Sequence, residues 1–332
     1  IVTFFSVCAF PSFVIFFLLV MLWSTVHCCF PFKDNFTICF HLFANTMADI
    51  QAFITSINDS TRRRDGQSLS KIIALPLKKS PIPKLYSQLA QRATSLNALA
   101  YCASNIRGDS TMATLVGNML LALAAFCGDR WQEAYDFEVL VYESALAYFK
   151  ESETNWPSPI LITASNDLRI LASIVRSCRV FIPHSFIHSL SLTVSSLMHF
   201  LLLCCLSLQV DAKLFSQGHE CLRKAIATLT TGFQAAVKTA PISDPDSKKV
   251  AIFGVTNCLF KIYFKLDTLH LCGKLINAVE RPGPESPMQN LHCFPLVDVV
   301  TYKFYIGKLR MFEDKYVEAR YVSEQDLHVD YH

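Results

Sequence analysis

The sequence predicts an all-α fold built as a stack of helical hairpins, and three observations support this prediction. Glycine is scarce, with 10 residues among 332. The prolines gather at 76–83, 157–159, 241–245 and 282–287, and such clusters usually separate helices. Between the clusters, apolar residues recur at helical spacing, and no stretch shows the strict alternation of a half-buried strand.

The helical runs have the pattern of a solenoid. In the run 131–149, the small residues Ala134 and Ala145 alternate with large apolar residues. The segment 308–319 repeats this pattern, with apolar residues at i, i+4 and i+7: Phe312, Tyr316 and Ala319. Small residues at such positions let one helix of a pair pack closely against the next. The sequence therefore predicts a tetratricopeptide-like helical-hairpin solenoid.

The composition is unevenly distributed along the chain. Hydrophobic residues make up 52% of the sequence and charged residues 17%, whereas about 25% is usual for charged residues in soluble domains. Residues 1–32 and 180–210 contain no Asp, Glu, Lys or Arg. Elsewhere the balance is that of a soluble protein, long enough to bury its own core. The net charge of +3 is too small to indicate nucleic-acid binding by itself.

The first apolar stretch, residues 4–30, is long enough to cross a bilayer. It lacks the basic residues that usually precede a secretory signal. Met47 then opens an amphipathic run with apolar residues at helical spacing: Ile50, Phe53, Ile54 and Ile57. We interpret residues 1–46 as translated upstream sequence, with a signal anchor as the alternative.

The second apolar stretch, residues 180–210, also has two interpretations. It is rich in residues with pyrimidine-heavy codons, and Arg179-Val180 can be encoded across a GT donor site, so a retained intron is a specific hypothesis. Removing the stretch joins two amphipathic helical runs. The alternative is a transmembrane helix over residues 187–208, which hydropathy alone does not distinguish from the intron.

A third uncharged run, residues 110–128, has charged residues immediately outside it and contains Thr, Asn and Gly. It is slightly short for a membrane span. We predict a buried core helix.

Catalytic and metal-binding motifs are absent from the sequence. There is no glycine-rich phosphate loop, no GxSxG and no HExxH. The 13 cysteines include no CxxC pair, and His270 and Cys272 stand alone as a candidate pair of ligands. We therefore expect no enzyme activity, no cofactor and no metal.

Basic residues in the second half of the chain form a candidate surface for a partner or for nucleic acid. Lys261 and Lys265 are four residues apart on a predicted helix and share a face. The full candidate set is Lys248, Lys249, Lys261, Lys265, Lys303, Lys308 and Arg310. The simpler interpretation is a solvated polar face, because no aromatic residue is clearly placed to stack on bases. The neighbouring aromatic residues are expected to pack between helices: Tyr263, Phe264, Tyr302, Phe304 and Tyr305.

Two blocks, residues 246–280 and 300–319, resemble the PCI-domain proteins of the Thp-type, signalosome subunit twelve-like family. The resemblance is weaker over 47–179 and covers 211–319 well. It implies a right-handed helical solenoid followed by a winged helix. It also implies binding to a Sac-type scaffold and a small acidic Sem/DSS-type subunit, with RNA or DNA contacted by the joined surface.

After Ala319 the sequence departs from the family pattern. Residues 320–332 form a divergent tail where the family continues into the winged helix, so we expect the winged helix to be missing and the chain to be C-terminally truncated. In the family, nucleic-acid contact and much of the partner contact reside in that part.

The predicted function is a non-enzymatic scaffold subunit of a nuclear, transcription-coupled mRNA export complex, located in the nucleus and at the nuclear pore. Two alternatives remain. One is an integral membrane protein anchored by residues 4–30 and 187–208. The other is a PCI subunit of a signalosome or proteasome-lid complex.

Overall fold

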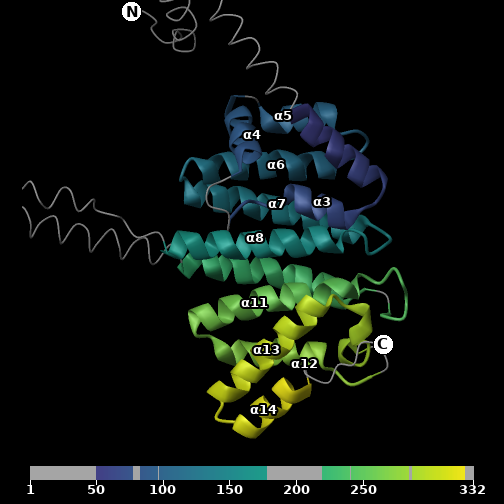
Figure 1. The fold of residues 1–332 in the computed structure, drawn as a ribbon, viewed down its shortest axis with the longest axis vertical. Helices are drawn as coiled ribbons and strands as arrows, with labels where there is room; N and C mark the ends of the chain where they lie inside the picture. Colours follow the sequence, from purple (N-terminus) through teal and green to yellow (C-terminus); the bar gives the residue numbers. More distant parts are fainter. Residues whose placement is uncertain are drawn as a thin grey trace, which may run out of the picture. The chain divides into compact units, whose positions relative to one another are not determined.

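The computed structural model describes residues 50–77, 83–95, 97–177, 219–239, 241–283 and 286–325. All of these belong to one compact unit, residues 50–332. The regular elements among them are α-helices and short 3-10 helices, without a strand, which confirms the all-α prediction (Figure 1). The interpretations of residues 1–46, 180–210 and 187–208 lie outside the described residues, as does the tail beyond 325.

The first half of the unit is helical over residues 50–62 and then through six labelled helices. These are α3 (Gly66–Ile73), α4 (Lys84–Ser95), α5 (Ala98–Asn105), α6 (Ser110–Cys127), α7 (Trp131–Glu151) and α8 (Ser158–Ser177). The apolar residues predicted to open this region are all buried: Ile50, Phe53, Ile54 and Ile57.

The second half begins with helical residues 219–237. It continues with η1 (Lys248–Ala251), α11 (Ile252–Leu266), η2 (Leu269–Leu271), α12 (Cys272–Val279), η3 (Pro287–Gln289), η4 (Leu291–Cys293), α13 (Leu296–Phe312) and α14 (Tyr316–Gln325). The described prolines of these clusters fall between helices or at a helix start, as the sequence predicted.

Two hairpin turns in this fold are built in the same way. After α6, Asp129 adopts a left-handed conformation with φ 55°, and the amide of Arg130 donates to the carbonyl of Ala125 at 2.9 Å. After α13, Asp314 has φ 59°, and the amide of Lys315 donates to the carbonyl of Arg310 at 2.9 Å. This six-to-one hydrogen bond around a left-handed residue is a Schellman helix end.

The second of these turns corrects the sequence interpretation of residues 308–319 as a single helical run. The chain leaves the helix after Phe312, and Tyr316 begins α14. The repeated pattern is instead a turn followed by the first helical turn of the next helix. In both copies the small residue lies three positions beyond the first helical residue and is buried, Ala134 at 0% and Ala319 at 6% exposure.

Helix α6 lies in the core of the unit. It contacts α4, α5 and α7, and its N-cap Asp109 accepts a hydrogen bond from the amide of Met112 at 2.9 Å. Among the described helices, it is long and apolar enough to cross a membrane by length and composition, and 72% of that apolar window is buried within the fold. This burial confirms the prediction of a core helix.

Helices α8 and α11 lie side by side and run in the same direction. Near their N-termini, a Cβ placed on Gly254 would come within 2.8 Å of the Ile162 side chain, so glycine allows the close approach. Near their C-termini, Arg176 Nη1 donates to the carbonyl of Lys265 at 2.6 Å. Two parallel helices in contact are what a stack of hairpins produces from successive repeats.

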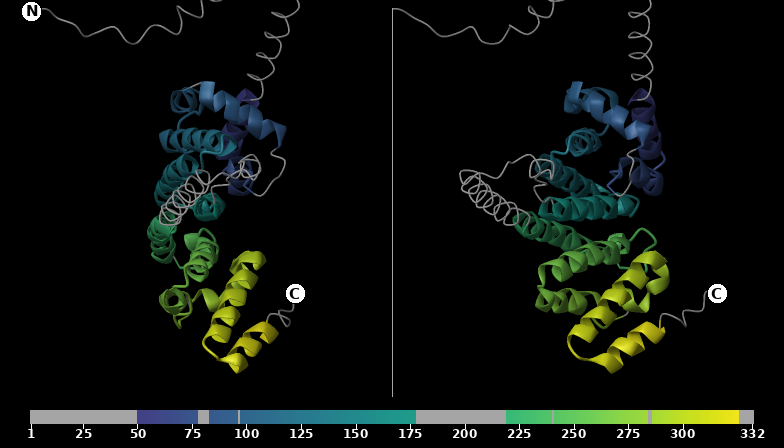
Figure 2. Two further views of the ribbon diagram at one scale, coloured as in Figure 1. Left: turned by 90° about the vertical axis from the view of Figure 1, so that its left-hand side faces the viewer. Right: turned by 60° about the vertical axis from the view of Figure 1, so that its left-hand side comes forward.

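Helical residues 219–237 pack against α7 and α8. Tyr135 Oη of α7 donates to the carbonyl of Cys221 at 2.8 Å. A Cβ at Gly232 would meet Tyr142 Oη of α7, with Leu161 of α8 nearby. Further along the chain, α14 packs against α13 and lies apart from α11 in both views of Figure 2.

Candidate partner-binding surfaces

Lys248, the first of the predicted surface residues, is used inside the fold. Its Nζ donates to the carbonyls of Phe149 at 2.6 Å and Lys150 at 3.2 Å, in the last turn of α7. Carbonyls at a helix C-terminus have no helical donor, so the ammonium caps them. Nζ also lies 5.3 Å from the centroid of the Phe149 ring. Burial lowers the pKa of Lys248. The adjacent Lys249 is half-buried.

Lys261 and Lys265 both lie on α11, as predicted. Lys265 Nζ donates to the carbonyl of Ser173 in α8 at 3.4 Å, in return for the bond that Arg176 makes to the Lys265 carbonyl. Burial, followed by the charges of Arg176 and Arg169, lowers the pKa of Lys265. Lys261 is half-buried.

The three candidates on α13 have different surroundings. Lys303 is buried, with 7% exposure. Lys308 Nζ lies 4.9 Å from the centroid of the Phe264 ring. Arg310 forms ion pairs with Glu313 at 2.9 Å and with Glu318 at 3.3 Å, and the second pair links α13 to α14.

Three cations lie near one another where the C-terminal half of α8 runs beside the end of α11. Here Arg169 and Arg176 of α8 join Lys265 of α11, and the sequence analysis did not single out either arginine. The sequence signal that could have identified them is their spacing of seven residues, which places both on one side of a helix. That they face Lys265 depends on α8 and α11 being parallel neighbours. The surface formed by the predicted basic residues stays a prediction.

Helix α13 exposes a stripe of apolar residues, hereafter the α13 stripe. Its members are Leu296 at 47%, Val300 at 45%, Phe304 at 59% and Met311 at 49% exposure. The first three are spaced i, i+4 and i+8, so they share one side of the helix. Helix α14 adds further exposed apolar residues: Tyr316, Val317 and Tyr321.

The exposure of Phe304 corrects one sequence expectation. Tyr302 is fully buried and stacks on Phe260 with ring centroids 5.7 Å apart, which confirms interhelical packing for that residue. Phe304 contacts Tyr305 edge to face but leaves more than half of its surface exposed. Exposed apolar surfaces are common at protein contact sites, so the α13 stripe is a candidate surface.

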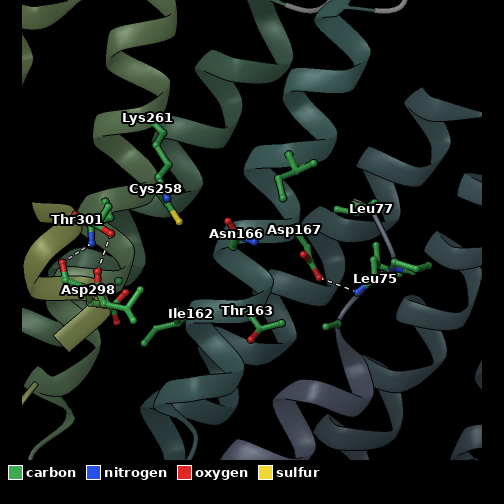
Figure 3. Close-up of a pocket in the computed structure, with 16 residues that line it drawn as sticks. Leu75, Leu77, Ile162, Thr163, Asn166, Asp167, Cys258, Lys261, Asp298 and Thr301 are labelled. Carbon is green, nitrogen blue, oxygen red and sulfur yellow. Dashed lines mark hydrogen bonds between the residues drawn. The ribbon is translucent and has the colours of Figure 1, made fainter. Parts of the chain in front are cut away.

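A groove of about 390 Å³ lies over α8 and α11 (Figure 3). One wall is the non-helical segment 74–77 that follows α3, and the other is the start of α13, with Asp298 and Thr301. The floor includes Asn166 and Lys261. The groove thus joins residues from four separate parts of the chain.

Some polar side chains along this groove already have hydrogen-bond partners within the protein. Asp167 Oδ2 accepts a hydrogen bond from the amide of Leu75 at 2.9 Å. Asn257 Nδ2 donates to the carbonyl of Asp298 at 2.8 Å, whereas its Oδ1 has no hydrogen-bond partner among the described residues. Burial raises the pKa of Asp298, and the charge of Lys261 opposes this shift.

A buried acidic residue lies close to Asp167, which lines the groove. Glu138 of α7 is 1% exposed, and its Oε2 has no hydrogen-bond partner within the described part of the chain. Burial, with the charge of Asp167 as the second cause, raises the pKa of Glu138 well above its usual range. Burial therefore favours the neutral, protonated form of this carboxyl over the charged form.

The described residues contain no cluster of three His, Cys, Asp or Glu side chains able to hold a metal ion. Burial raises the pKa of Cys102 to about 12 and that of Cys272 to about 11. Such thiols are poor nucleophiles at neutral pH, because the reactive form is the thiolate.

The chain is similar to several curated proteins. It is 28% identical over 192 residues to PCI domain-containing protein 2 of Xenopus laevis, covering 56% of this chain and 38% of the frog protein. It is 26% identical over 271 residues to the PCI domain-containing protein 2 homolog of Dictyostelium discoideum, covering 82% of this chain and 54% of the relative. It is 36% identical over 80 residues to the protein CSN12 homolog of Gibberella zeae, covering 24% of this chain and 17% of the relative.

The similarity to these relatives supports the interpretation of this chain as a PCI-domain protein. The helical solenoid predicted from the sequence agrees with that similarity. The chain spans between about a third and about half of the length of the first two relatives. No protein-family profile matches the chain, and no solved structure matches it.

Proposed function

We propose that this protein is a non-enzymatic scaffold subunit of a nuclear, transcription-coupled mRNA export complex. It binds a Sac-type scaffold protein and a small acidic Sem/DSS-type subunit through protein-protein contacts. Its site of action is the nucleus, including the nuclear pore. The similarity to PCI domain-containing proteins supports the scaffold role, and the finer assignment to mRNA export is the part that needs experiment.

The α13 stripe is the observation that carries this proposal. Its members lie on a well-formed helix whose opposite side is buried, with Tyr302 at 0% and Ile306 at 5% exposure. Helices in a solenoid bury both sides when another helix packs over them. Large exposed apolar residues in a contiguous row are the centre of many protein interfaces, and a few of them supply most of the binding energy.

Contact with RNA or DNA is a secondary part of the proposal. Arg169, Arg176 and Lys265 supply positive charge at one place on the surface of α8 and α11. Arginine and lysine side chains contribute to nucleic-acid affinity by contacting phosphates. Any such affinity should fall steeply with salt concentration.

Co-purification tests the scaffold role. The full chain is mixed separately with a Sac-type scaffold and with a Sem/DSS-type subunit, and complexes are detected by size-exclusion chromatography with light scattering. We expect a stable complex that the substitution Val300→Asp weakens by at least tenfold, because a charge in an apolar interface must be desolvated. Leu140→Asp, at a comparably exposed leucine on α7, is the matched control.

A helical chain that binds neither partner would contradict the proposal. Binding that survives Val300→Asp and is lost in Leu140→Asp would move the interface away from the α13 stripe. Circular dichroism of both variants establishes that each retains its helices.

Membership in a signalosome-type or proteasome-lid complex is the second candidate. The observation that favours it is the similarity to the protein CSN12 homolog of Gibberella zeae. Affinity purification of the tagged full chain separates the two candidates by the set of subunits recovered.

The domain division is also part of the proposal. It places helical repeats at 47–179 and 211–319. Residues 1–46 are then translated upstream sequence, and residues 180–210 come from a retained intron. Sequencing the mature mRNA across the codons for Arg179 to Asp211 tests the second boundary. A transcript that lacks the 180–210 codons supports the division, and one that retains them contradicts it.

A further inference from the structure

A pocket separate from the groove over α8 and α11 lies where two other helices end, hereafter the α7-end pocket. Its volume is about 460 Å³, and the residues that line it include Thr61, Arg64, Tyr148, Glu151, Glu153 and Trp156. The first two belong to the end of helix 50–62, and the others belong to the last turn of α7 and the loop before α8. The pocket is therefore formed by segments that are far apart in the chain.

The two helix ends make the α7-end pocket electronegative. Helix 50–62 closes at Arg64, which has a left-handed φ of 54°. Helix α7 ends at Glu151. The C-terminal end of a helix carries a partial negative charge that favours a nearby cation. Two such ends at one pocket therefore attract positive charge.

The side chains of the pocket add to this negative potential. Glu151 and Glu153 are exposed, and neither forms an ion pair with a described residue. Among the described residues that line the pocket, Arg64 supplies the positive charge. Two carboxylates against one guanidinium leave an excess of negative charge, so a further cation would be held favourably.

Two aromatic side chains complete the pocket. Tyr148 and Trp156 meet edge to face with ring centroids 5.4 Å apart, and both are half-buried. Tyr148 and Glu151 are three residues apart, so they share one side of α7. Cations are attracted to the faces of aromatic rings, most strongly to tryptophan. The pocket thus combines aromatic surface with carboxylates, and both favour a positively charged ligand.

The chain itself shows a cation bound at this end of α7. Lys248 Nζ donates to the carbonyls of Phe149 and Lys150 and lies 5.3 Å from the centroid of the Phe149 ring. One ammonium therefore contacts helix-end carbonyls and an aromatic ring together. Successive helical residues point about 100° apart, so Tyr148 faces a different side of the helix from Phe149. The α7-end pocket is a second position of similar chemistry.

We propose that the α7-end pocket binds the cationic end of a lysine or arginine side chain from a partner protein. The cation lies against the Trp156 ring, and its N–H groups donate to the carboxylates of Glu151 and Glu153. An ammonium has three N–H donors and a guanidinium has five, so either can contact both carboxylates. This inference depends on the proposed scaffold role only in taking the side chain from a partner protein.

Capped tripeptides with lysine or arginine between two glycines are the probes, and the same peptide with norleucine is the uncharged control. The full chain is labelled with 5-fluorotryptophan, and the fluorine NMR signals of Trp131 and Trp156 are assigned with the corresponding Trp→Phe variants. Each peptide is titrated at constant ionic strength, so that the screening of surface charges does not change.

We expect at least one cationic peptide to shift the Trp156 signal to saturation and to leave Trp131, at the other end of α7, unchanged. The norleucine peptide should bind about tenfold more weakly, because it lacks the charge that the ring and the carboxylates attract. Glu153→Gln should weaken binding about threefold, since it removes one exposed charge. Glu143→Gln, at an exposed glutamate of α7, is the matched control and should bind as the parent does.

Tighter binding of the lysine peptide identifies a lysine as the ligand, and tighter binding of the arginine peptide identifies an arginine. Shifts without saturation for both peptides would overturn the inference, as would equal shifts of Trp156 and Trp131. Equal affinities of the parent and Glu153→Gln would also overturn it. The Sac-type and Sem/DSS-type complexes are measured separately. Complexes that form while neither peptide binds would remove the pocket inference alone, and peptide binding without either complex would contradict the proposed function alone.

Discussion

Helices α6 and α14 are covered to very different extents. Helix α6 contacts α4, α5 and α7, and its large side chains such as Leu120 are fully buried. Helix α14 packs against α13, and Val317 and Tyr316 are 84% and 64% exposed. Helices within the stack are therefore covered on both sides, whereas the last described hairpin leaves one face exposed. That exposed face is where we propose that a partner binds.

The largest expected effect is a loss of unfolding free energy in α6 that is absent in α14. Leu120→Ala in α6 should lower the free energy of unfolding by about 3 kcal/mol, because it leaves a cavity in a packed core. Val317→Ala in α14 should change it by less than about 0.5 kcal/mol. Urea unfolding followed by circular dichroism measures both. Similar losses for the two variants would mean that α14 is as well covered as α6.

Replacing two glycines by alanine should change the stability of the fold in opposite directions. A Cβ on Gly66 would lie 1.8 Å from the Trp156 carbonyl oxygen, so Gly66→Ala should destabilise the fold by about 1–3 kcal/mol. Gly273 in α12 has no neighbouring atom within 4 Å of an added Cβ. Gly273→Ala should stabilise by up to about 1 kcal/mol, because alanine is the better helix former. Thermal unfolding midpoints that move in the same direction would contradict this contrast.

The buried Glu138 gives the first half of the unit a pH dependence. In the unfolded chain this carboxyl titrates near its ordinary pKa of 4.5, and in the folded chain its pKa is raised. Above pH 4.5 the folded state therefore binds more protons than the unfolded state, so stability falls as pH rises, by up to about 1.4 kcal/mol per pH unit. Glu138→Gln should remove this fall.

Urea unfolding at several pH values between about 5 and 8 measures this effect, over the window where a raised carboxyl pKa acts. Glu143→Gln, on the exposed side of the same helix, should keep the pH dependence of the parent. A parent and a Glu138→Gln variant with equal slopes would show that Glu138 is ionised in the folded chain.

The smallest predicted effect concerns the contact between the two halves of the described unit. Lys248→Ala removes the cap on the last carbonyls of α7 and should cost about 1 kcal/mol. Lys274→Ala, at an exposed lysine of α12, should have little effect. Equal stability of these two variants in urea would indicate that solvent satisfies the α7 carbonyls as well as Lys248 does.

Much of the helical architecture could be predicted from local patterns. The run at 131–149 became α7, the uncharged run at 110–128 became the buried α6, and prolines marked the breaks. The break between α13 and α14 was missed, because an aspartate at position 314 takes the left-handed conformation that glycine usually supplies. The repeated Asp-Arg-Trp and Asp-Lys-Tyr triplets, at 129–131 and 314–316, were the signal that could have located it.

The candidate surfaces were harder to predict than the helices. Sequence patterns identified the lysines on α11 and α13 as candidates. They did not indicate that Lys248 caps another helix or that Lys303 is buried. Nor could it place Arg176 beside Lys265, since 89 residues separate them in the chain. Asn257 gave no sequence signal, because its unpaired oxygen is a property of its surroundings.

The sequence by itself determined that this protein is helical, where most helices lie, and that its pattern resembles PCI-domain proteins. These properties depend on spacings of a few residues, which act through local backbone geometry and the periodicity of burial. The tertiary structure alone decided which basic residues are used within the fold, which apolar side of α13 stays open, and that α8 and α11 together form a groove. Those properties depend on contacts between segments far apart in the chain, whose pairing no local pattern encodes.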